Sequence, residues 1–509
     1  MRTLPTAVRT ALATTITAVG LTASLPAQTA SADDISALRE QIRLLDQKLR
    51  VLERNQELKD ETAVADAKKQ PKITVGDGRV EIASADGANS LRLRGLVQAD
   101  ARFFFDQSDA ATAQDQFLLR RARLIFEGKF ADRFSYVIQP EFGGSTVSIL
   151  DAYVSTAVIP EFNVQIGRFK TPVGLEQLQS DSVAFFNERS VATNLAPNRD
   201  VGVQFFGPLA NNRLTYQAAV TNGVIDGGNS PADSANAEGD LTYSGRLFAT
   251  PFVNDKDSSL KGLGFGVGGA TGNYHGSFSN LGATTASANT LLGSYRTDGQ
   301  QTFFRYRSAS SLAPTNGIPT VNNTTIANGT SYVISPQAHF YYGPLGVIAE
   351  YFYTGSDVSI GSGATLNAQT LNNKAYNLSV GYVLTGEDAG FKGVVPKTNF
   401  NPSAGTWGAF EVVARFANLD IDDNAFVDPD GAGAKQSLAN RNNSATEVTT
   451  YGLGLNWYLS KSVRFGVDYF YNKFDLPPGA SPAPTPTSGG NKALLDDEQV
   501  VIGRFQVSF

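Results

Sequence analysis

The chain has 509 residues but no cysteine, one methionine and only two histidines, His275 and His339. The lack of cysteine excludes disulfides, thiolate nucleophiles and the metal sites that thiolates build. Neither histidine belongs to a motif that we recognise, so the sequence offers no catalytic residue, no metal ligands and no cofactor site. A formal net charge of −6 also argues against a nucleic-acid partner, because proteins that bind nucleic acids are normally basic.

Long apolar segments are scarce as well. Beyond the N-terminus no run reaches the roughly 18 apolar residues that a membrane-spanning helix needs, which excludes a helical membrane protein. A membrane β-barrel is not excluded, because its strands alternate apolar and polar residues and average to modest hydropathy. What the chain has in abundance are 49 glycines, 32 phenylalanines and 18 tyrosines, a mixture typical of aromatic strands joined by tight turns. The composition therefore predicts an all-β fold.

The N-terminus predicts export. Residues 1–32 combine Arg2 and Arg9, an apolar stretch at 11–25 and small residues at 30–32, which is the pattern of a cleaved signal peptide. A retained membrane anchor is the less favoured interpretation, because the apolar stretch is short and diluted by threonines. We expect the mature chain to begin at Asp33.

Residues 33–61 predict a short α-helical coiled coil. Their apolar residues follow a strict heptad spacing at a and d positions: Ile35, Leu38, Ile42, Leu45, Leu49 and Leu52. Three heptads are marginal alone in water, so their association would need help from an attached oligomer. Isoleucine at a with leucine at d leans towards dimers, so these positions do not argue for a trimer. A single amphipathic helix lying on its own domain is the alternative. The polar segment 62–72 predicts a linker.

From Leu91 onward the dominant sequence period is two. In the first such stretch, apolar residues from Leu91 to Phe105 alternate with polar residues from Arg92 to Arg102. Similar stretches predict about sixteen antiparallel strands, near residues 91–105, 116–130, 133–142, 148–157, 161–169, 199–207, 211–221, 241–250, 260–272, 331–342, 344–354, 373–386, 407–419, 447–459, 462–474 and 497–509. Bacterial outer-membrane barrels require an even number of strands, so we interpret 73–509 as a transmembrane antiparallel β-barrel.

The connections between these strands favour an outer-membrane barrel over a soluble one. Short turns such as 131–132 alternate with long loops such as 273–330, and the last strand ends on Phe509, which resembles the assembly signal of such barrels. About sixteen strands enclose a lumen too wide for side chains to fill, so we expect apolar residues to face lipid and polar residues to face a water-filled interior. The predicted location is the bacterial outer membrane, with 33–61 in the periplasm. The long connection 387–406 does not fit this alternation.

The connection 170–198 predicts a pore constriction. Phe185, Phe186 and Leu195 lie there among charged residues such as Glu188 and Arg189. Because so much apolar surface would be costly to leave in water, we expect the loop to fold into the barrel. An external loop that packs on a neighbouring subunit is the alternative.

Basic residues recur at predicted lumen positions, and such residues at a narrowing attract anions, so we hypothesise an anion preference. The pore-lining candidates are Arg94, Arg102, Arg120, Arg121, Arg123, Asp151, Lys170, Gln177, Arg189, Arg305 and Arg307. In the competing interpretation, acids in the strands pair with the arginines as ordinary wall salt bridges. These acids are Glu127, Glu141, Asp151, Glu350, Glu411 and Asp468.

Five segments, in order along the chain, resemble the phosphate-selective porin O and P family. They are RRAR at 120–123, IGRFKTPVGLE at 166–176, ERS at 188–190, LTGE at 384–387 and GLGLNWY at 452–458. The likeness runs from about Ile73 to Phe509. The resemblance implies a homotrimer of sixteen-stranded barrels in outer-membrane lipid, an inward-folded third loop, and passive uptake of small anions such as phosphate.

Two departures from the family concern the solute. A lysine follows the GLE segment in the phosphate-selective members, whereas Gln177 stands here, and their arginine ladder near the fifth outer loop is reduced to Arg296, Arg305 and Arg307. The sequence therefore predicts a porin for small hydrophilic solutes that prefers anions. The alternative is a general porin without anion selectivity that also tethers the outer membrane through a cell-wall or periplasmic partner of its coiled coil. An outer-membrane hydrolase is less favoured, because it would need a nucleophile with a partner at the barrel rim.

Overall fold

The computed structural model describes residues 32–67, 69–76, 79–105, 114–144, 146–224, 226–229, 240–279, 287–308, 324–429, 435–480 and 497–509. The chain divides into two units, residues 1–70 and 71–509, and each is described by itself. The predicted signal peptide, 1–32, lies outside the described residues except for Ala32, so its cleavage stays a prediction.

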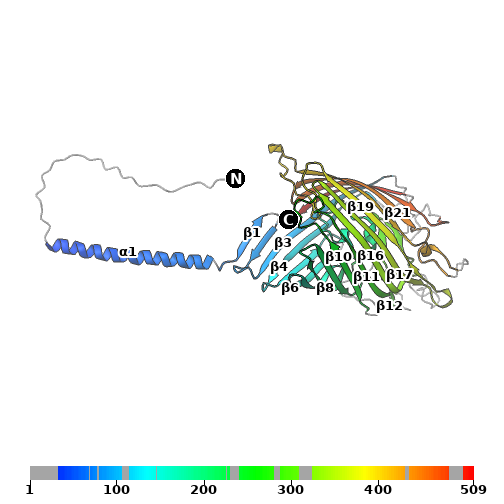
Figure 1. The fold of residues 1–509 in the computed structure, drawn as a ribbon, viewed down its shortest axis with the longest axis horizontal. Coiled ribbons are helices and arrows are strands. Elements are labelled where there is room, and N and C mark those ends of the chain that lie inside the picture. Colours follow the sequence, from blue (N-terminus) through cyan, green and yellow to red (C-terminus); the bar gives the residue numbers. More distant parts are fainter. Residues whose placement is uncertain are drawn as a thin grey trace. The chain divides into compact units, whose positions relative to one another are not determined.

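The first unit holds one long helix, α1, over Ala32–Ala67 (Figure 1). It covers the predicted helix 33–61 and continues into the predicted linker 62–72, where alanines favour the helix. Its heptad side chains are all exposed. Within the described ranges, no helix combines the length and the apolar character that crossing a membrane requires. The helix itself is confirmed, whereas its association into a coiled coil stays a prediction.

The second unit is a closed antiparallel β-barrel (Figure 1). Sixteen strands of the described residues follow one another around the wall, and the last strand pairs with the first. Their bounds are β3 Ser90–Phe105, β4 Gln116–Phe130, β5 Phe134–Glu141, β6 Ser148–Ile159, β7 Phe162–Lys170, β8 Arg199–Leu209, β9 Leu214–Thr221, β10 Thr242–Ala249, β11 Gly264–His275, β16 Ile326–Tyr342, β17 Leu345–Ile360, β19 Lys374–Val383, β20 Ala409–Asp420, β21 Glu447–Ser460, β22 Val463–Asp475 and β23 Asp497–Ser508. The all-β prediction and the number of strands are confirmed.

Short turns gather at one end of the barrel, which we call the turn end; the opposite end is the loop end. The short turns are 131–133, 160–161, 210–213, 343–344 and 461–462. At the loop end the structure has more strand than we expected. β16 and β17 extend beyond their predicted limits, and β18 (Asn367–Leu371) pairs with the end of β17. The loops predicted at 273–330 and 355–372 are correspondingly shorter.

A hairpin that the sequence did not predict precedes the barrel. It consists of β1 (Lys72–Gly76) and β2 (Arg79–Ala83), and β2 pairs with the first residues of β3. The last strand, β23, does not pair with these first residues of β3, because the chain ends where the Phe509 backbone exchanges hydrogen bonds with Gly95. The hairpin therefore continues the sheet where the barrel closes.

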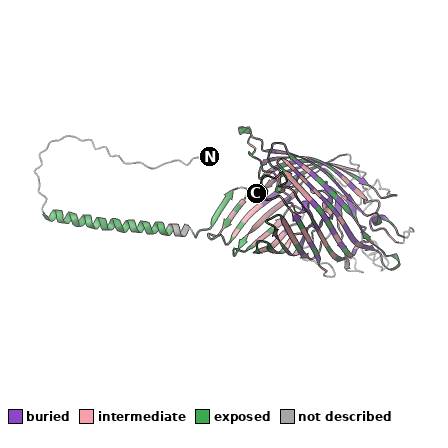
Figure 2. Cartoon of the chain, in the orientation of Figure 1, coloured by how far each residue is buried: buried purple, intermediate pink, exposed green. Residues whose placement is uncertain are grey.

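The predicted faces of the strands are confirmed (Figure 2). On β21, Tyr451, Leu453 and Leu455 are exposed, while Gly452 and Asn456 on the opposite face are buried. The same alternation holds on β3 and β22. An apolar outer face and a polar inner face follow, as lipid outside and a polar lumen inside require.

A hydrophobic cluster lies at the loop end of the barrel, where the sequence predicted polar residues facing a water-filled lumen. The short strands β14 (Ser294–Arg296) and β15 (Thr302–Arg305) form a hairpin whose Tyr295, Phe303 and Phe304 are fully buried. They join a hydrophobic cluster with residues of 171–198, of 421–446 and of the wall, which we call the loop-end cluster. Burial of this apolar surface stabilises the packing of these loops against the wall. Strand periodicity could not predict this cluster, because Tyr295, Phe303 and Phe304 belong to a connection between barrel strands.

The connection 384–408, which contains the unexplained segment 387–406, also folds against the barrel. Inside the barrel, the Phe391 ring stacks on His339 with centroids 5.6 Å apart, and the Phe391 carbonyl accepts a hydrogen bond from Gln179 at 2.9 Å. At the rim, Trp457 of β21 donates its indole N–H to the Trp407 carbonyl at 2.6 Å. The connection is long because it reaches inwards to the 171–198 loop as well as joining two strands.

Candidate pore constriction

The loop between β7 and β8, residues 171–198, folds into the lumen. We call it the constriction loop. It contains the short helix α2 (Leu175–Leu178) and the 3-10 helix η1 (Val191–Leu195). Val173 and Phe186 are 0% exposed, and Asn187 donates hydrogen bonds to wall carbonyl groups on β22 and β23. The predicted inward fold of this loop is confirmed.

Glycines on the inner wall leave room for the constriction loop. A Cβ atom on Gly268 of β11 would lie 2.2 Å from the Val173 carbonyl oxygen. A Cβ atom on Gly346 of β17 or on Gly381 of β19 would lie 2.9 or 2.7 Å from the Phe185 ring. These separations are below van der Waals contact, so larger residues there would push the loop off the wall.

Two wall carboxylates hold the loop by its backbone. Glu350 of β17 accepts hydrogen bonds from the N–H groups of Leu175 and Glu176, the latter at 2.8 Å. Asp468 of β22 accepts one from the Asn187 N–H at 2.6 Å. In the competing interpretation these two acids pair with arginines as wall salt bridges, whereas in the structure both accept hydrogen bonds from backbone N–H groups of the loop. The salt-bridge interpretation does hold for the wall acids Glu127, Glu141 and Asp151.

Glu188 of the loop lies among several wall guanidinium groups. Its carboxylate accepts hydrogen bonds from Arg102 at 2.9 Å, Arg120 at 2.7 Å and Arg504 at 2.8 Å. Asp100 of β3 joins this group through Arg504 at 2.6 Å and 2.8 Å. The predicted lumen arginines are therefore neutralised in part by acids of the loop as well as by acids of the wall.

A β-bulge brings the adjacent Arg120 and Arg121 to the same side of the wall. Gln98 of β3 pairs with Arg121, and Ala99 pairs with Leu119, so Arg120 is the extra residue of β4. A bulge breaks the strict alternation of the strand and redirects a side chain. Both arginines consequently reach acids of the constriction loop.

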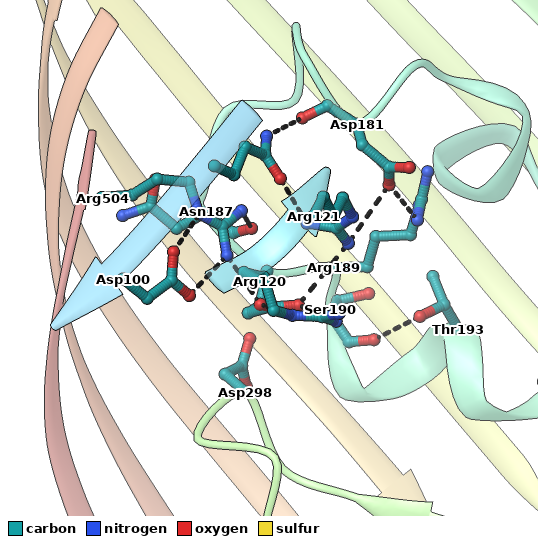
Figure 3. A network of polar contacts seen from close by, with 12 residues as sticks. Asp100, Arg120, Arg121, Asp181, Asn187, Arg189, Ser190, Thr193, Asp298 and Arg504 are labelled. Atoms are coloured by element: carbon teal, nitrogen blue, oxygen red, sulfur yellow. Dashed lines mark hydrogen bonds and ion pairs between the residues drawn. The ribbon is translucent and has the colours of Figure 1, made fainter. Parts of the chain in front are cut away.

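Asp181 forms a second group of the same kind. Its carboxylate lies 2.5 Å from the Arg189 guanidinium and 3.4 Å from that of Arg121 (Figure 3). It also contacts the Arg123 guanidinium. Burial acts to raise the pKa values of Asp181 and Glu188, but the surrounding guanidinium groups hold both well below their usual range. Both loop carboxylates are therefore charged at neutral pH, and each neutralises one positive charge near the lumen centre.

Arg415 of β20 makes a third contact with the loop, and the sequence analysis did not single it out. Its guanidinium lies 2.8 Å from Glu176 of the loop and 2.6 Å from Asp298 of the β14–β15 hairpin. Burial raises the pKa of Asp298 to about 6, although Arg415 opposes this shift. The alternation along β20 places Arg415 on the same face as the buried Glu411, and that signal could have found it.

A cavity of about 860 Å³ lies in the lumen between the constriction loop and residues of the turn end. Eight basic side chains line it: Arg79, Arg92, Arg94, Arg123, Lys170, Arg199, Lys392 and Lys461. Three acidic side chains line it, Glu127, Asp151 and Asp181, together with the terminal residue Phe509. The excess of positive charge gives the cavity a potential that attracts anions.

The predicted pore-lining residues fall into three places. Arg94, Arg123, Asp151 and Lys170 line the cavity, whereas Arg102, Arg120, Arg121 and Arg189 pair with the loop carboxylates. Gln177 is buried, and its carbonyl accepts a hydrogen bond from the Lys170 ammonium at 2.8 Å. Arg305 and Arg307 belong neither to the cavity lining nor to the ion pairs with the loop carboxylates. Arg307 donates hydrogen bonds to Ser437. That any of them contacts a permeating solute stays a prediction.

Five of the eight basic lining residues are absent from the predicted pore-lining set, namely Arg79, Arg92, Arg199, Lys392 and Lys461. Lys392 and Lys461 come from turn-end connections, where strand alternation assigns no face. Arg79 belongs to the unpredicted hairpin. The alternation on β3 put Arg92 on the lumen face, so that residue was within reach of the argument.

A closed barrel with an apolar outer face, a polar inner face and a loop folded across its lumen is the architecture of an outer-membrane porin. The family described as phosphate-selective porin O and P matches residues 91–477, and the chain belongs to that family. It is a channel of the bacterial outer membrane, which sets aside the hydrolase alternative.

Comparisons with known proteins found a curated relative and several similar solved structures. The chain is 24% identical to Porin O of Pseudomonas aeruginosa over 424 residues, which cover 78% of this chain and 86% of that protein. Among solved structures it is similar to the outer membrane channel DcaP of Acinetobacter baumannii, with 12% identity, a TM-score of 0.46, and coverage of 83% and 98% of the two chains. An anion-selective porin from Comamonas acidovorans is similar at 11% identity and a TM-score of 0.46, with coverage of 83% and 100%.

Proposed function

We propose that this porin lets small hydrophilic solutes diffuse across the outer membrane and prefers anions among them. The observation that carries the proposal is the cavity beneath the constriction loop, where eight basic side chains face three acidic ones. Charges inside a low-dielectric wall are screened poorly, so they act over most of a narrow passage. Phosphate and similar oxyanions suit this chemistry, because guanidinium groups present paired donors to such oxygens.

The proposal includes a homotrimer whose turn end and α1 face the periplasm. The exposed heptad side chains of α1 support self-association of the helix, because apolar residues at a and d positions are buried when helices pair. The exposed apolar residues of the strands support lipid as the partner of the outer wall.

A tethering role is the second candidate, supported by the length of α1 and by the exposure of its side chains over residues 32–62. Deleting residues 33–67 separates the two roles. The protein that lacks these residues should conduct as the full chain does in planar bilayers. Cells that carry this deletion variant should lose envelope integrity if the helix binds a cell-wall or periplasmic partner. Unchanged integrity would argue against the tether.

The anion preference is tested by removing positive charge from the cavity. Arg123 and Arg199 line it, and the double variant Arg123→Gln/Arg199→Gln leaves their partners Asp181, Glu141 and Asp151 less well balanced. The ratio of anion to cation permeability in planar bilayers should fall strongly.

Arg213→Gln is the matched control, because Arg213 is a half-exposed arginine of a turn paired with Asp255 outside the cavity. It should leave the permeability ratio unchanged. An equal change in the double variant and in the control would contradict the assignment of the cavity as the selective region.

A further inference from the structure

Asp181 occupies a position that an oxyanion from solution could take. Its carboxylate contacts the guanidinium groups of Arg189 at 2.5 Å and Arg121 at 3.4 Å (Figure 3). It also contacts that of Arg123. Arginine binds carboxylate and phosphate oxygens through the same planar fork of N–H donors. A carboxylate held by three such groups is therefore a chemical stand-in for a bound oxyanion.

The position is open towards the permeation region. Asp181 lines the 860 Å³ cavity together with its neighbours Ser180 and Ser182 and with Arg123. Lys170 lies on the same cavity wall, where its ammonium donates to the Gln179 carbonyl at 2.9 Å. Removing the Asp181 carboxylate would therefore uncover guanidinium groups to a water-accessible space that already carries excess positive charge.

The other loop carboxylate differs in this respect. Glu188 also accepts hydrogen bonds from three guanidinium groups, with a fourth, that of Arg121, 3.9 Å away, but it is not among the residues that line the cavity. Its group serves to fasten the constriction loop to β3, β4 and β23. Of the two carboxylates, Asp181 is the one that an anion in the cavity could replace.

We propose that Asp181 is a built-in competitor, which fills from within the chain an oxyanion site formed by Arg121, Arg123 and Arg189. The channel then attracts oxyanions through its general potential but does not hold them. This inference rests on the proposed anion-conducting function and states how that function treats phosphate. The absence of the family lysine at Gln177 acts in the same direction, since it also removes a positive charge from the loop.

The test is block of chloride current by inorganic phosphate, measured with the full-length channel in planar bilayers. Asp181→Asn keeps the shape of the side chain and removes the negative charge that faces Arg121, Arg123 and Arg189. The phosphate concentration for half-block should fall at least about tenfold, which corresponds to about 1.4 kcal/mol of tighter binding.

Asp151→Asn is the matched control. It removes the same charge from the same cavity, but Asp151 pairs with a single guanidinium, that of Arg199. The control should shift the half-block concentration by less than about twofold, an effect of general potential alone. Adding Arg189→Gln to Asp181→Asn should reverse most of the gain, because one member of the site is lost.

Buried arginines without their partner can destabilise the loop, so folding is followed separately. Phosphate, unlike chloride, should raise the thermal unfolding temperature of the Asp181→Asn protein and leave that of the wild type unchanged. If asparagine prevents folding, Asp181→Ser is measured in the same way. Equal phosphate block in Asp181→Asn and Asp151→Asn, or no change in either, overturns the proposal. A cation-selective wild type whose Asp181→Asn variant gains phosphate block overturns the proposed function and supports the oxyanion site.

Discussion

Replacing Glu350 by alanine should release the constriction loop from the barrel wall. Both oxygens of this buried carboxylate accept backbone N–H groups at the start of α2, from Leu175 and Glu176. The wall itself should be unaffected, because Glu350 lies within β17, where the strand is held by its backbone pairing. The substitution therefore tests the placement of the loop rather than the stability of the barrel.

The magnitude follows from the donors that lose their acceptor. A buried N–H group without a partner costs about 1–3 kcal/mol, so the loss of both bonds should weaken the inward position by about 2–6 kcal/mol. Glu350→Gln keeps one acceptor oxygen and should show roughly half of this effect. A loop that leaves the wall part of the time widens the passage, so single-channel conductance should rise and the open-channel current should become noisier.

The assay combines planar-bilayer conductance with limited proteolysis of residues 171–198 in the folded barrel. Glu127→Ala is the control, because Glu127 is a wall acid whose hydrogen bonds go to Arg92 and Arg94. It should leave loop cleavage unchanged. Unaltered conductance and unaltered cleavage in Glu350→Ala would refute the view that this carboxylate anchors the loop.

Two further predictions concern closure of the barrel and pH. A Cβ atom on Gly95 would lie 2.3 Å from the Phe509 ring, whereas one on Gly503 would meet only the Ala101 carbonyl at 3.9 Å. Gly95→Ala should therefore lower the yield of folded, heat-modifiable barrel on gels, and Gly503→Ala should leave that yield unchanged. Burial raises the pKa of Asp226 to about 6, although the hydrogen bond from Tyr295 lowers it. The folded state thus binds this proton more tightly than the unfolded state, and the loop-end cluster should lose up to about 3 kcal/mol as the pH rises from about 4 to 6. Protease protection of 287–308 at both pH values measures this loss, which Asp226→Asn should abolish.

The barrel was predictable because its signal is local and repeated. A period of two identifies each strand, and an even number of strands with an apolar outer face leaves few folds other than a membrane barrel. The inward fold of the constriction loop was predictable for a similar reason, since Phe185 and Phe186 could not stay in water. These inferences needed no knowledge of which residues meet across the lumen.

The parts that escaped prediction depend on contacts between distant segments. Glu350 and Arg123 both lie on strands and face the lumen. Glu350 accepts a backbone N–H of the constriction loop, whereas Arg123 forms an ion pair with a carboxylate of that loop. Only the path of the loop decides which kind of contact each residue makes. The β1–β2 hairpin was missed because two five-residue strands carry too little pattern. The packing of Tyr295, Phe303 and Phe304 in the loop-end cluster was missed because those aromatic residues lie outside the barrel strands.

The central claim is that the passage favours anions, and the zero-current potential of the wild-type channel tests it most directly. Purified full-length protein is placed in a planar bilayer that separates two potassium chloride solutions of roughly tenfold different concentration, where the two ions have nearly equal mobility in bulk. The excess of basic side chains around the cavity predicts a dilute side that becomes negative, because chloride crosses ahead of potassium. A dilute side that becomes positive would show that the acids of the loop and the wall outweigh the arginines, and it would contradict the anion preference.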